Sequence, residues 1–307
     1  MIKNAEIKKV AEGLGFPEGP VYMQDGSVIF VELRERTVKR VSNEGKVTLI
    51  ADCGGSPNGL AIGPDGAAYV CNNGGSRFMA GSWRSLGAAE DYKGGLIQRI
   101  DLSNGTLTTL YSECNGERLS SPNDLVFDKH GGFYFSDIGK TMPRHREHGG
   151  VYYALPDGSS IKPVVYPILS PNGVGLSPDE TILYVAETET GRVWAFDIEA
   201  PGYLHKQPFP SPHGGRLLYG LDGFQRLDSL AVDSEGNVCV GTLMSGYITV
   251  ISPEGKLLRQ VKFPDIYPTN ICFGGSDMRT AYVTLSETGQ LVSIPWPVPG
   301  LKLNFST

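Results

Sequence analysis

Cysteine, basic clusters and long apolar runs are all scarce in this sequence. The five cysteines are odd in number and form no Cys-x-x-Cys pair, so we predict free thiols rather than a disulfide framework or a thiolate zinc site. Lysine and arginine are scattered along a chain of formal net charge -6, which argues against nucleic acid as a partner. No run has the length of a membrane span, and the first residues lack the apolar core of a secretory signal, so we expect a cytoplasmic protein outside the membrane.

Glycine and proline, by contrast, are abundant and evenly spread. The chain of 307 residues has 40 glycines and 21 prolines among 40% hydrophobic residues. This composition is typical of many short strands joined by tight turns and predicts an all-β protein.

A six-fold internal repeat predicts the architecture. Each copy contains a short apolar alternation, a turn with Asp-Gly, Gly-Gly or a similar pair, and a second strand, which is the pattern of a β-hairpin. Further strand-like segments follow each hairpin. We therefore predict a six-bladed β-propeller of four-stranded blades, forming a single domain over residues 1–307. The copies begin at Pro17, Pro57, Pro122, Pro171, Leu227 and Thr269.

The two ends of the chain are predicted to share the last blade. Only QLVSIPW follows the sixth hairpin before a Pro-rich tail, whereas IKKVAEGLGFPE near the N-terminus resembles the join between an outer strand and the next blade. We expect residues 7–10 to complete the sixth blade and remove an open sheet edge.

Longer spacings between the repeats locate inserted loops at residues 76–94, 139–149 and 201–225. The first could cover the channel mouth as a lid that presents Phe78, Met79 or Trp83, or it could be a surface loop packed on its own aromatic residues. The charged segment 144–148, inside the second loop, is predicted to be solvated.

One polar residue stands near the start of the first strand of each repeat, and six-fold repetition brings these residues to one end of the central channel. Two carboxylates among them balance a divalent cation, and amide oxygens complete a shell of the kind that hard cations prefer. Calcium is the first expectation, and Mn²⁺, Fe²⁺, Zn²⁺ and Mg²⁺ stay open because geometry distinguishes them. The alternative is a set of polar residues that only lines a wet channel. The six are Glu18, Asn58, Asn123, Asn172, Asp228 and Asn270.

The segments FPEGPVY, SPNDLVFD, SPNGVGLSPD and PTNICFGG occur in this order over nearly the whole chain. With them the sequence resembles the senescence marker protein, gluconolactonase and luciferin-regenerating enzyme family of six-bladed propellers. The resemblance implies hydrolysis of a sugar lactone, a small-molecule substrate, or of a phosphotriester, with one bound divalent metal. It implies Glu18, Asn172 and Asp228 as metal ligands, Asn123 as a ligand or substrate contact, and Asp124 as a contact to substrate hydroxyls.

Three positions depart from the animal members of that family. Ser121 stands where those members have an arginine, Asn58 stands where they lack an amide, and Ser229 replaces a glycine after Asp228. We therefore expect a substrate pocket that differs from theirs.

The expected mechanism combines a metal that polarises the lactone carbonyl with a carboxylate that activates water. Asp228 is the candidate base, with a role as ligand alone left open, and Asn58 and Asn270 would orient substrate or water. Phe224, Gln225 and Arg226 are further pocket candidates. No Ser-His-Asp set can be assembled, and the alternatives are phosphotriester hydrolysis at the same metal or a non-enzymatic, metal-stabilised binding propeller.

Overall fold

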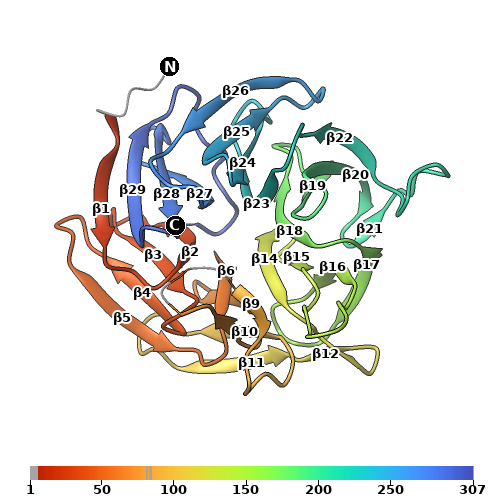
Figure 1. Ribbon diagram of the computed structural model, residues 1–307, viewed down its shortest axis with the longest axis horizontal. Coiled ribbons are helices and arrows are strands. Elements are labelled where there is room, and N and C mark those ends of the chain that lie inside the picture. The colour runs from red at the N-terminus through yellow and green to blue at the C-terminus, as the bar shows by residue number, and fades with distance from the viewer. Residues whose placement is uncertain (1–5, 81, 83–84, 307) are drawn as a thin grey trace.

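The computed structural model describes residues 6–80, 82 and 85–306. These residues form β-strands joined by turns and loops, without an α-helix among them. Six sheets are arranged as blades around a central axis, which confirms the predicted six-bladed propeller (Figure 1). Within the described ranges there is no helix long and apolar enough to cross a membrane.

Each blade is an antiparallel sheet whose first strand lies at the centre and whose last strand lies at the rim. The inner strands are β2 (Pro17–Tyr22), β6 (Pro57–Ile62), β14 (Pro122–Phe127), β18 (Pro171–Leu176), β23 (Arg226–Val232) and β27 (Pro268–Gly274). The second strands are β3 (Val28–Glu32), β7 (Ala68–Asn72), β15 (Phe133–Asp137), β19 (Ile182–Glu187), β24 (Val238–Leu243) and β28 (Thr280–Leu285). The third strands are β4 (Thr37–Val41), β10 (Leu96–Ile100), β16 (Gly149–Ala154), β20 (Arg192–Ala200), β25 (Tyr247–Ile251) and β29 (Gln290–Pro295). The outer strands are β5 (Val47–Asp52), β11 (Leu107–Tyr111), β17 (Ile161–Ile168), β22 (Arg216–Gly220), β26 (Leu257–Lys262) and β1 (Lys8–Glu12).

The N-terminal strand closes the propeller. β1 pairs antiparallel with β29, with Lys8 opposite Ser293 and Glu12 opposite Gln290. The predicted closure is therefore confirmed, and the strand runs two residues further than the expected end at Val10. Because the first and last segments share one sheet, the ring has no open edge at which the blades could separate.

The fourth blade differs from the prediction in its outer strand. Residues 201–225 were expected to be an inserted loop, but β22 lies within this range and pairs with β20. The expectation was wrong here because the chain first forms the short strand β21 (Tyr203–Leu204) against the end of β20 and only then returns to complete the blade.

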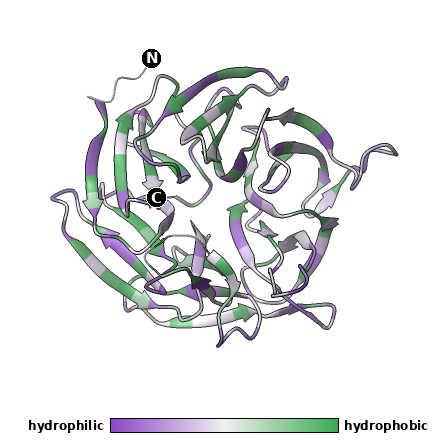
Figure 2. Cartoon of the chain, in the orientation of Figure 1, coloured by the Kyte–Doolittle hydropathy of each residue, from purple (hydrophilic) through white to green (hydrophobic). Residues whose placement is uncertain are grey.

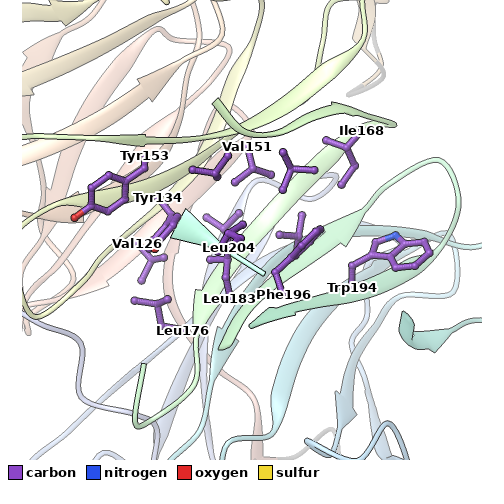
Figure 3. Close-up of a cluster of buried hydrophobic side chains, with 14 residues drawn as sticks. Val126, Tyr134, Val151, Tyr153, Ile168, Leu176, Leu183, Trp194, Phe196 and Leu204 are labelled. Carbon is purple, nitrogen blue, oxygen red and sulfur yellow. The ribbon is translucent and has the colours of Figure 1, made fainter. Parts of the chain in front are cut away.

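The hydrophobic core is divided among the contacts between neighbouring blades. Alternating side chains of one strand serve two interfaces: Ile29 and Val31 pack toward the second blade, whereas Val28 and Phe30 pack toward the sixth. Figure 3 shows the cluster between the third and fourth blades, which includes Trp194. Hydrophobic residues gather on the strands and hydrophilic residues on many of the connecting loops (Figure 2). The five cysteines are buried free thiols, as predicted.

Candidate metal and substrate site

The polar residues of the predicted ring lie in irregular starts of the inner strands. In each of the six blades, the pairing between the inner strand and the second strand shifts register near this residue, for example between Glu18 and Val21 and between Pro122 and Leu125. A proline at or next to the first position of a strand removes an N–H donor only at the end of the hydrogen-bond ladder. A bulge changes the direction of a side chain that would otherwise point to alternate faces of the sheet. Local sequence thus directs these side chains toward the channel.

Glycines after the ring residues allow the inner strands to approach closely. A Cβ atom on Gly19 would lie 2.6 Å from the backbone oxygen of Asn58, and φ at Gly19 is 51°. A Cβ atom on Gly59 would lie 2.6 Å from the backbone oxygen of Asn123. Since no side chain fits at these points, glycine keeps neighbouring ring residues within one small space.

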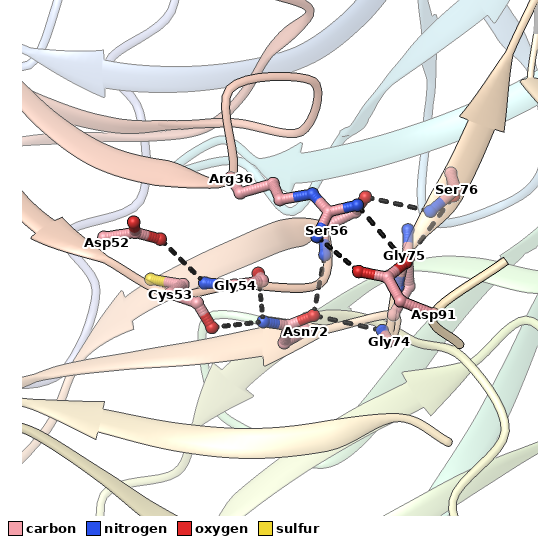
Figure 4. A network of polar contacts seen from close by, with 11 residues as sticks. Arg36, Asp52, Cys53, Gly54, Ser56, Asn72, Gly74, Gly75, Ser76 and Asp91 are labelled. Atoms are coloured by element: carbon pink, nitrogen blue, oxygen red, sulfur yellow. Dashed lines mark hydrogen bonds and ion pairs between the residues drawn. The ribbon is translucent and has the colours of Figure 1, made fainter. Parts of the chain in front are cut away.

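A second set of polar residues, at the ends of the second strands, holds the loops that precede the ring. Asp137 accepts hydrogen bonds from the backbone N–H groups of Ser120, Ser121 and Gly139 at 2.7, 2.7 and 3.0 Å. Oδ1 of Asn72 accepts a hydrogen bond from the backbone N–H of Ser56 at 2.9 Å, as Figure 4 shows. The equivalent residues of the first and fourth blades are Glu32, which accepts from Gly15, and Glu187, which accepts from Leu169.

These end-of-strand residues were not singled out from the sequence. The signal was available, because the repeated hairpins of the first four blades end in the dipeptides VE, CN, SD and AE. A polar residue that recurs at the end of a buried strand indicates an equivalent position in each repeat, and its side-chain oxygen accepts hydrogen bonds from backbone N–H groups of the loop before the ring residue.

Five of the six ring residues line one cavity of about 570 Å³ at the end of the channel where the inner strands begin. Asn270 is outside its lining, and its Nδ2 donates to Oε2 of Glu18 at 2.8 Å. Asp124 and Asn270 instead line a second cavity of about 390 Å³, formed by the later residues of the inner strands and by the C-terminal tail. The five residues of the first cavity are Glu18, Asn58, Asn123, Asn172 and Asp228.

Direct contacts join the ring residues in pairs. Asn172 donates through Nδ2 to Oδ1 of Asp228 at 2.7 Å and to the hydroxyl of Thr188 at 3.1 Å. The side-chain oxygens of Asn58 and Asn123 are buried and lack any hydrogen-bond partner within the protein. A buried acceptor without a partner costs roughly 1–3 kcal/mol, so two of them in one cavity mark a place built for a ligand.

The two carboxylates of the cavity are in an unfavourable setting for charge. Burial, followed by the charge of Asp228, raises the pKa of Glu18 well above its ordinary value. Burial raises the pKa of Asp228 to about 6, against the effect of the Asn172 hydrogen bond. Desolvated carboxylates that repel one another are stabilised by a cation placed between them.

The residues present therefore fit a divalent cation. Such an ion would balance the charges of Glu18 and Asp228 and supply a partner for the unsatisfied amide oxygen of Asn123. Among the described residues no three His, Cys, Asp or Glu side chains come together, so a cation here depends on amide oxygens as well as carboxylates. That mixture suits a hard ion such as Ca²⁺ better than a soft one.

Asp124 occupies a different environment from its neighbour Asn123. Burial raises the pKa of Asp124 to about 7, while hydrogen bonds from the Leu125 backbone and the Ser229 hydroxyl oppose this rise. The Ser229 hydroxyl also donates to Oδ1 of Asn172 at 3.4 Å, so it lies between the inner strands of the fourth and fifth blades. A contact between Asp124 and substrate hydroxyls stays a prediction.

The insertion 76–94 forms part of the cavity wall. Its hairpin, β8 (Ser76–Phe78) and β9 (Ser85–Ala88), contributes Phe78 and Leu86 to the lining. The ring centroid of Phe78 lies 5.7 Å from that of Phe16. Met79 is 40% exposed and outside the lining, and Trp83 lies outside the described residues.

The base of this hairpin is held to the first blade. Arg36 pairs with Asp91 at 2.6 Å, and the backbone N–H of Ser76 donates to Oγ of Ser56 at 3.0 Å (Figure 4). At the other side, the N–H of Ala88 donates to the carbonyl of Thr141 at 3.2 Å. The insertion therefore bridges the loops of three blades beside the cavity.

Three basic residues also line the cavity, and only one of them was expected. Arg226 was a pocket candidate together with Phe224, which is also in the lining, whereas Gln225 is not. Lys140 and Arg146 come from the loop 139–149. The prediction that residues 144–148 are solvated was wrong for Arg146, because this side chain is partly buried and pairs with Glu189 at 3.0 Å.

Comparison with known proteins agrees with the fold and shows the family. Residues 16–287 match the family model described as the SMP-30/gluconolactonase/LRE-like region. The lactonase drp35 of Staphylococcus haemolyticus is 31% identical over 262 residues, which cover 84% of this chain and 72% of that protein.

Solved structures share the propeller. A gluconolactonase from Xanthomonas campestris superposes with a TM-score of 0.74 at 25% identity, covering 95% of this chain and 89% of the other. Regucalcin from Agrobacterium tumefaciens, a calcium-binding protein, superposes with a TM-score of 0.76 at 16% identity, covering 98% of this chain and 97% of the other, and shows the shared fold. The match over residues 16–287, the Staphylococcus lactonase and the Xanthomonas gluconolactonase support lactone hydrolysis, and the chain belongs to the SMP-30/gluconolactonase/LRE-like family.

Proposed function

We propose that this protein is a metal-dependent lactonase that opens an aldonolactone-type ring by hydrolysis. The observation that carries the proposal is the meeting, in one cavity of about 570 Å³, of two buried carboxylates and two amide oxygens without partners. The lactonases among its relatives support the reaction class. A cavity of this size admits a sugar lactone beside a metal ion.

Glu18, Asn172 and Asp228, with Asn123, would hold the divalent ion, for which Ca²⁺ is the first candidate and Mn²⁺, Fe²⁺, Zn²⁺ and Mg²⁺ are alternatives. When bound, such an ion polarises the lactone carbonyl and stabilises the developing oxyanion. Asn270 keeps Glu18 in place through its 2.8 Å hydrogen bond. The unpartnered oxygen of Asn58 can accept a hydrogen bond from a substrate hydroxyl.

Asp228 is the proposed base. Water adds to the carbonyl carbon while its proton passes to the Asp228 carboxylate; the ring C–O bond then breaks, and the ring oxygen takes up a proton and leaves as the hydroxyl of a hydroxy acid. The hydrogen bond from Asn172 to Oδ1 fixes the orientation of this carboxylate. In the metal-free protein burial raises the pKa of Asp228 to about 6, so the carboxylate is ionised near neutral pH, and a bound cation would keep it ionised.

The test combines metal analysis with hydrolysis of an aldonolactone before chelation, after chelation and after return of the metal. We expect activity to be lost with the metal and restored by it, and Glu18→Gln and Asp228→Asn to abolish it. Asp222→Asn, at an exposed carboxylate of the same segment, is the matched control. Absence of metal together with insensitivity to chelation would contradict the proposal.

The same preparation separates the alternatives. A larger kcat/KM for a phosphotriester than for any lactone would favour phosphotriester hydrolysis at this site. Bound metal without hydrolysis of either substrate class would favour a metal-stabilised binding propeller, whose partner binding should survive Asp228→Asn.

A further inference from the structure

The side of the cavity formed by the inserted loops carries more positive than negative charge. Lys140 and Arg146 of the loop 139–149 line the cavity together with Arg226 at the start of β23, and Glu189 is the acidic residue in the lining that pairs with the two arginines. The floor of the same cavity carries the carboxylates of Glu18 and Asp228, whose charges a divalent ion would balance. With the ion in place, the three basic residues face one remaining acidic residue, Glu189, so two positive charges have no counter-charge in the lining.

The two arginines share a single acidic partner. Arg146 pairs through Nη1 with Oε1 of Glu189 at 3.0 Å, and Arg226 pairs through Nη2 with the same oxygen. The Nε atoms of both arginines are buried and have no hydrogen-bond partner in the protein. One carboxylate oxygen therefore serves two guanidinium groups, and each retains a donor that is unsatisfied.

Lys140 is an unusual residue for a cavity wall, because its side chain is buried and lacks an acidic partner. It is 4% exposed, and its Nζ donates to the backbone oxygen of Asn73 at 2.9 Å and to Oδ1 of the same residue at 3.3 Å. Among the ion pairs of the described residues, none includes Lys140. Burial lowers the pKa of Lys140 to about 8, and the charges of Asp137 and Glu147 oppose this shift without forming an ion pair with it.

Arg226 links this basic side to the proposed reaction centre. It stands two residues before Asp228 on β23, and both side chains line the same cavity, so the guanidinium lies beside the candidate base. A substrate whose lactone carbonyl is beside Asp228 would extend toward Arg226 and the loop side. An anionic group on that part of the substrate would meet donors of the fixed geometry that suits a carboxylate.

We propose that the preferred substrate is a lactone bearing a second, free carboxylate away from the ester, of the aldaric or uronic type, and that Arg146, Arg226 and Lys140 bind this carboxylate. The inference rests on the proposed lactonase function and adds the charge class of its substrate.

A matched pair of substrates tests this selectivity. D-Glucono-1,4-lactone and D-glucaro-1,4-lactone have the same ring and stereochemistry and differ at C6, where a hydroxymethyl group is replaced by a carboxylate. Release of acid by the metal-loaded protein is followed with each compound. We expect kcat/KM to be at least about tenfold higher for the glucarolactone, and this ratio to fall as salt is added.

Variants show whether the basic residues cause the preference. Arg146→Gln and Lys140→Gln should each lower the glucarolactone to gluconolactone ratio by about tenfold, and Arg146→Lys should lower it less. Arg144→Gln, at an exposed arginine of the same loop outside the cavity lining, is the control and should keep the ratio. If the arginines serve only to hold the loops, Arg146→Gln should reduce both activities equally and leave the ratio unchanged, which would overturn the proposal.

The failure of this inference differs from failure of the proposed function. Hydrolysis of both lactones with equal kcat/KM would overturn the inference and leave the lactonase function standing. If neither lactone is hydrolysed, the proposed function fails, and calorimetric titration with D-glucarate and D-gluconate still decides the charge preference. Equal affinities for these two acids in the wild type would count against the basic site, whereas tighter binding of glucarate that Arg146→Gln removes would support it.

Discussion

The carboxylate of Asp228 should destabilise the metal-free fold, so replacing it should have opposite effects on stability and function. Burial raises the pKa of Asp228 from 3.8 to about 6 in the folded protein. A difference of roughly two pKa units corresponds to about 3 kcal/mol. Because the pKa of Asp228 is higher in the folded protein than in the unfolded chain, folding favours the protonated carboxyl. The free energy of unfolding should therefore decrease as the pH rises from about 3.8 to above about 6.

Asp228→Asn removes the ionisable group and retains an oxygen that can accept the Asn172 hydrogen bond. In the presence of a chelator, the variant should therefore gain up to about 3 kcal/mol relative to wild type at about pH 8 and little at about pH 4. Urea unfolding at both pH values measures this difference. Asp222→Asn, at an exposed position, should shift the free energy of unfolding by the same small amount at both.

Added calcium should make the wild type at least as stable as Asp228→Asn at about pH 8. At a calcium concentration about 100-fold above Kd, the wild type should gain about 2.7 kcal/mol, and Asp228→Asn should gain much less. The reasoning is refuted if Asp228→Asn changes stability equally at both pH values and still responds to metal as the wild type does. Such a result would mean that the carboxylate is neither desolvated nor a ligand.

Three other expectations concern the same region. Metal affinity measured by calorimetry should fall at least about tenfold between about pH 7 and pH 5, because Asp228, with a pKa of about 6, must lose its proton to bind; a flat profile would exclude it as a ligand. Gly59→Ala would place Cβ 2.6 Å from the backbone oxygen of Asn123 and should cost about 1–3 kcal/mol on urea unfolding and weaken metal binding, whereas Gly220→Ala, whose Cβ would meet only Arg192 at 3.8 Å, should be tolerated. Asp137→Ala leaves three backbone N–H groups without their acceptor and should lower the free energy of unfolding by at least about 1–3 kcal/mol. It should also weaken metal binding, because the loop that Asp137 holds precedes Asn123; unchanged metal affinity would mean that the effect is confined to the loop.

Much of the fold was predictable because the repeat is local. Each hairpin carries its own alternation and turn, so the number of blades and, to within one residue, the start of each inner strand follow from the sequence alone. Closure by β1 was predictable for the same reason, since the segment before the first hairpin resembles the segments before the others. The outer strand β22 was not, because it follows the excursion through β21 and carries no repeat signal.

The candidate site divides in the same way. Glu18, Asn58, Asn123, Asn172 and Asp228 could be named from the sequence because the repeat gives them equivalent positions, and they line one cavity. The displacement of Asn270 and Asp124 to the second cavity depends on the depth at which each side chain meets the channel, which a repeat pattern does not contain.

The sequence by itself thus determined an all-β propeller and the polar ring at one end of its channel, since both depend on a period repeated along the chain. The tertiary structure decided the charge of the cavity wall. Lys140 and Arg146 lie in a loop without a repeat, and their roles depend on Asn73 and Glu189, which are 67 and 43 residues away. Contacts between different insertions arise only when the closed ring brings those loops over one channel mouth, and this is the physical reason that the substrate preference could not be inferred before the fold.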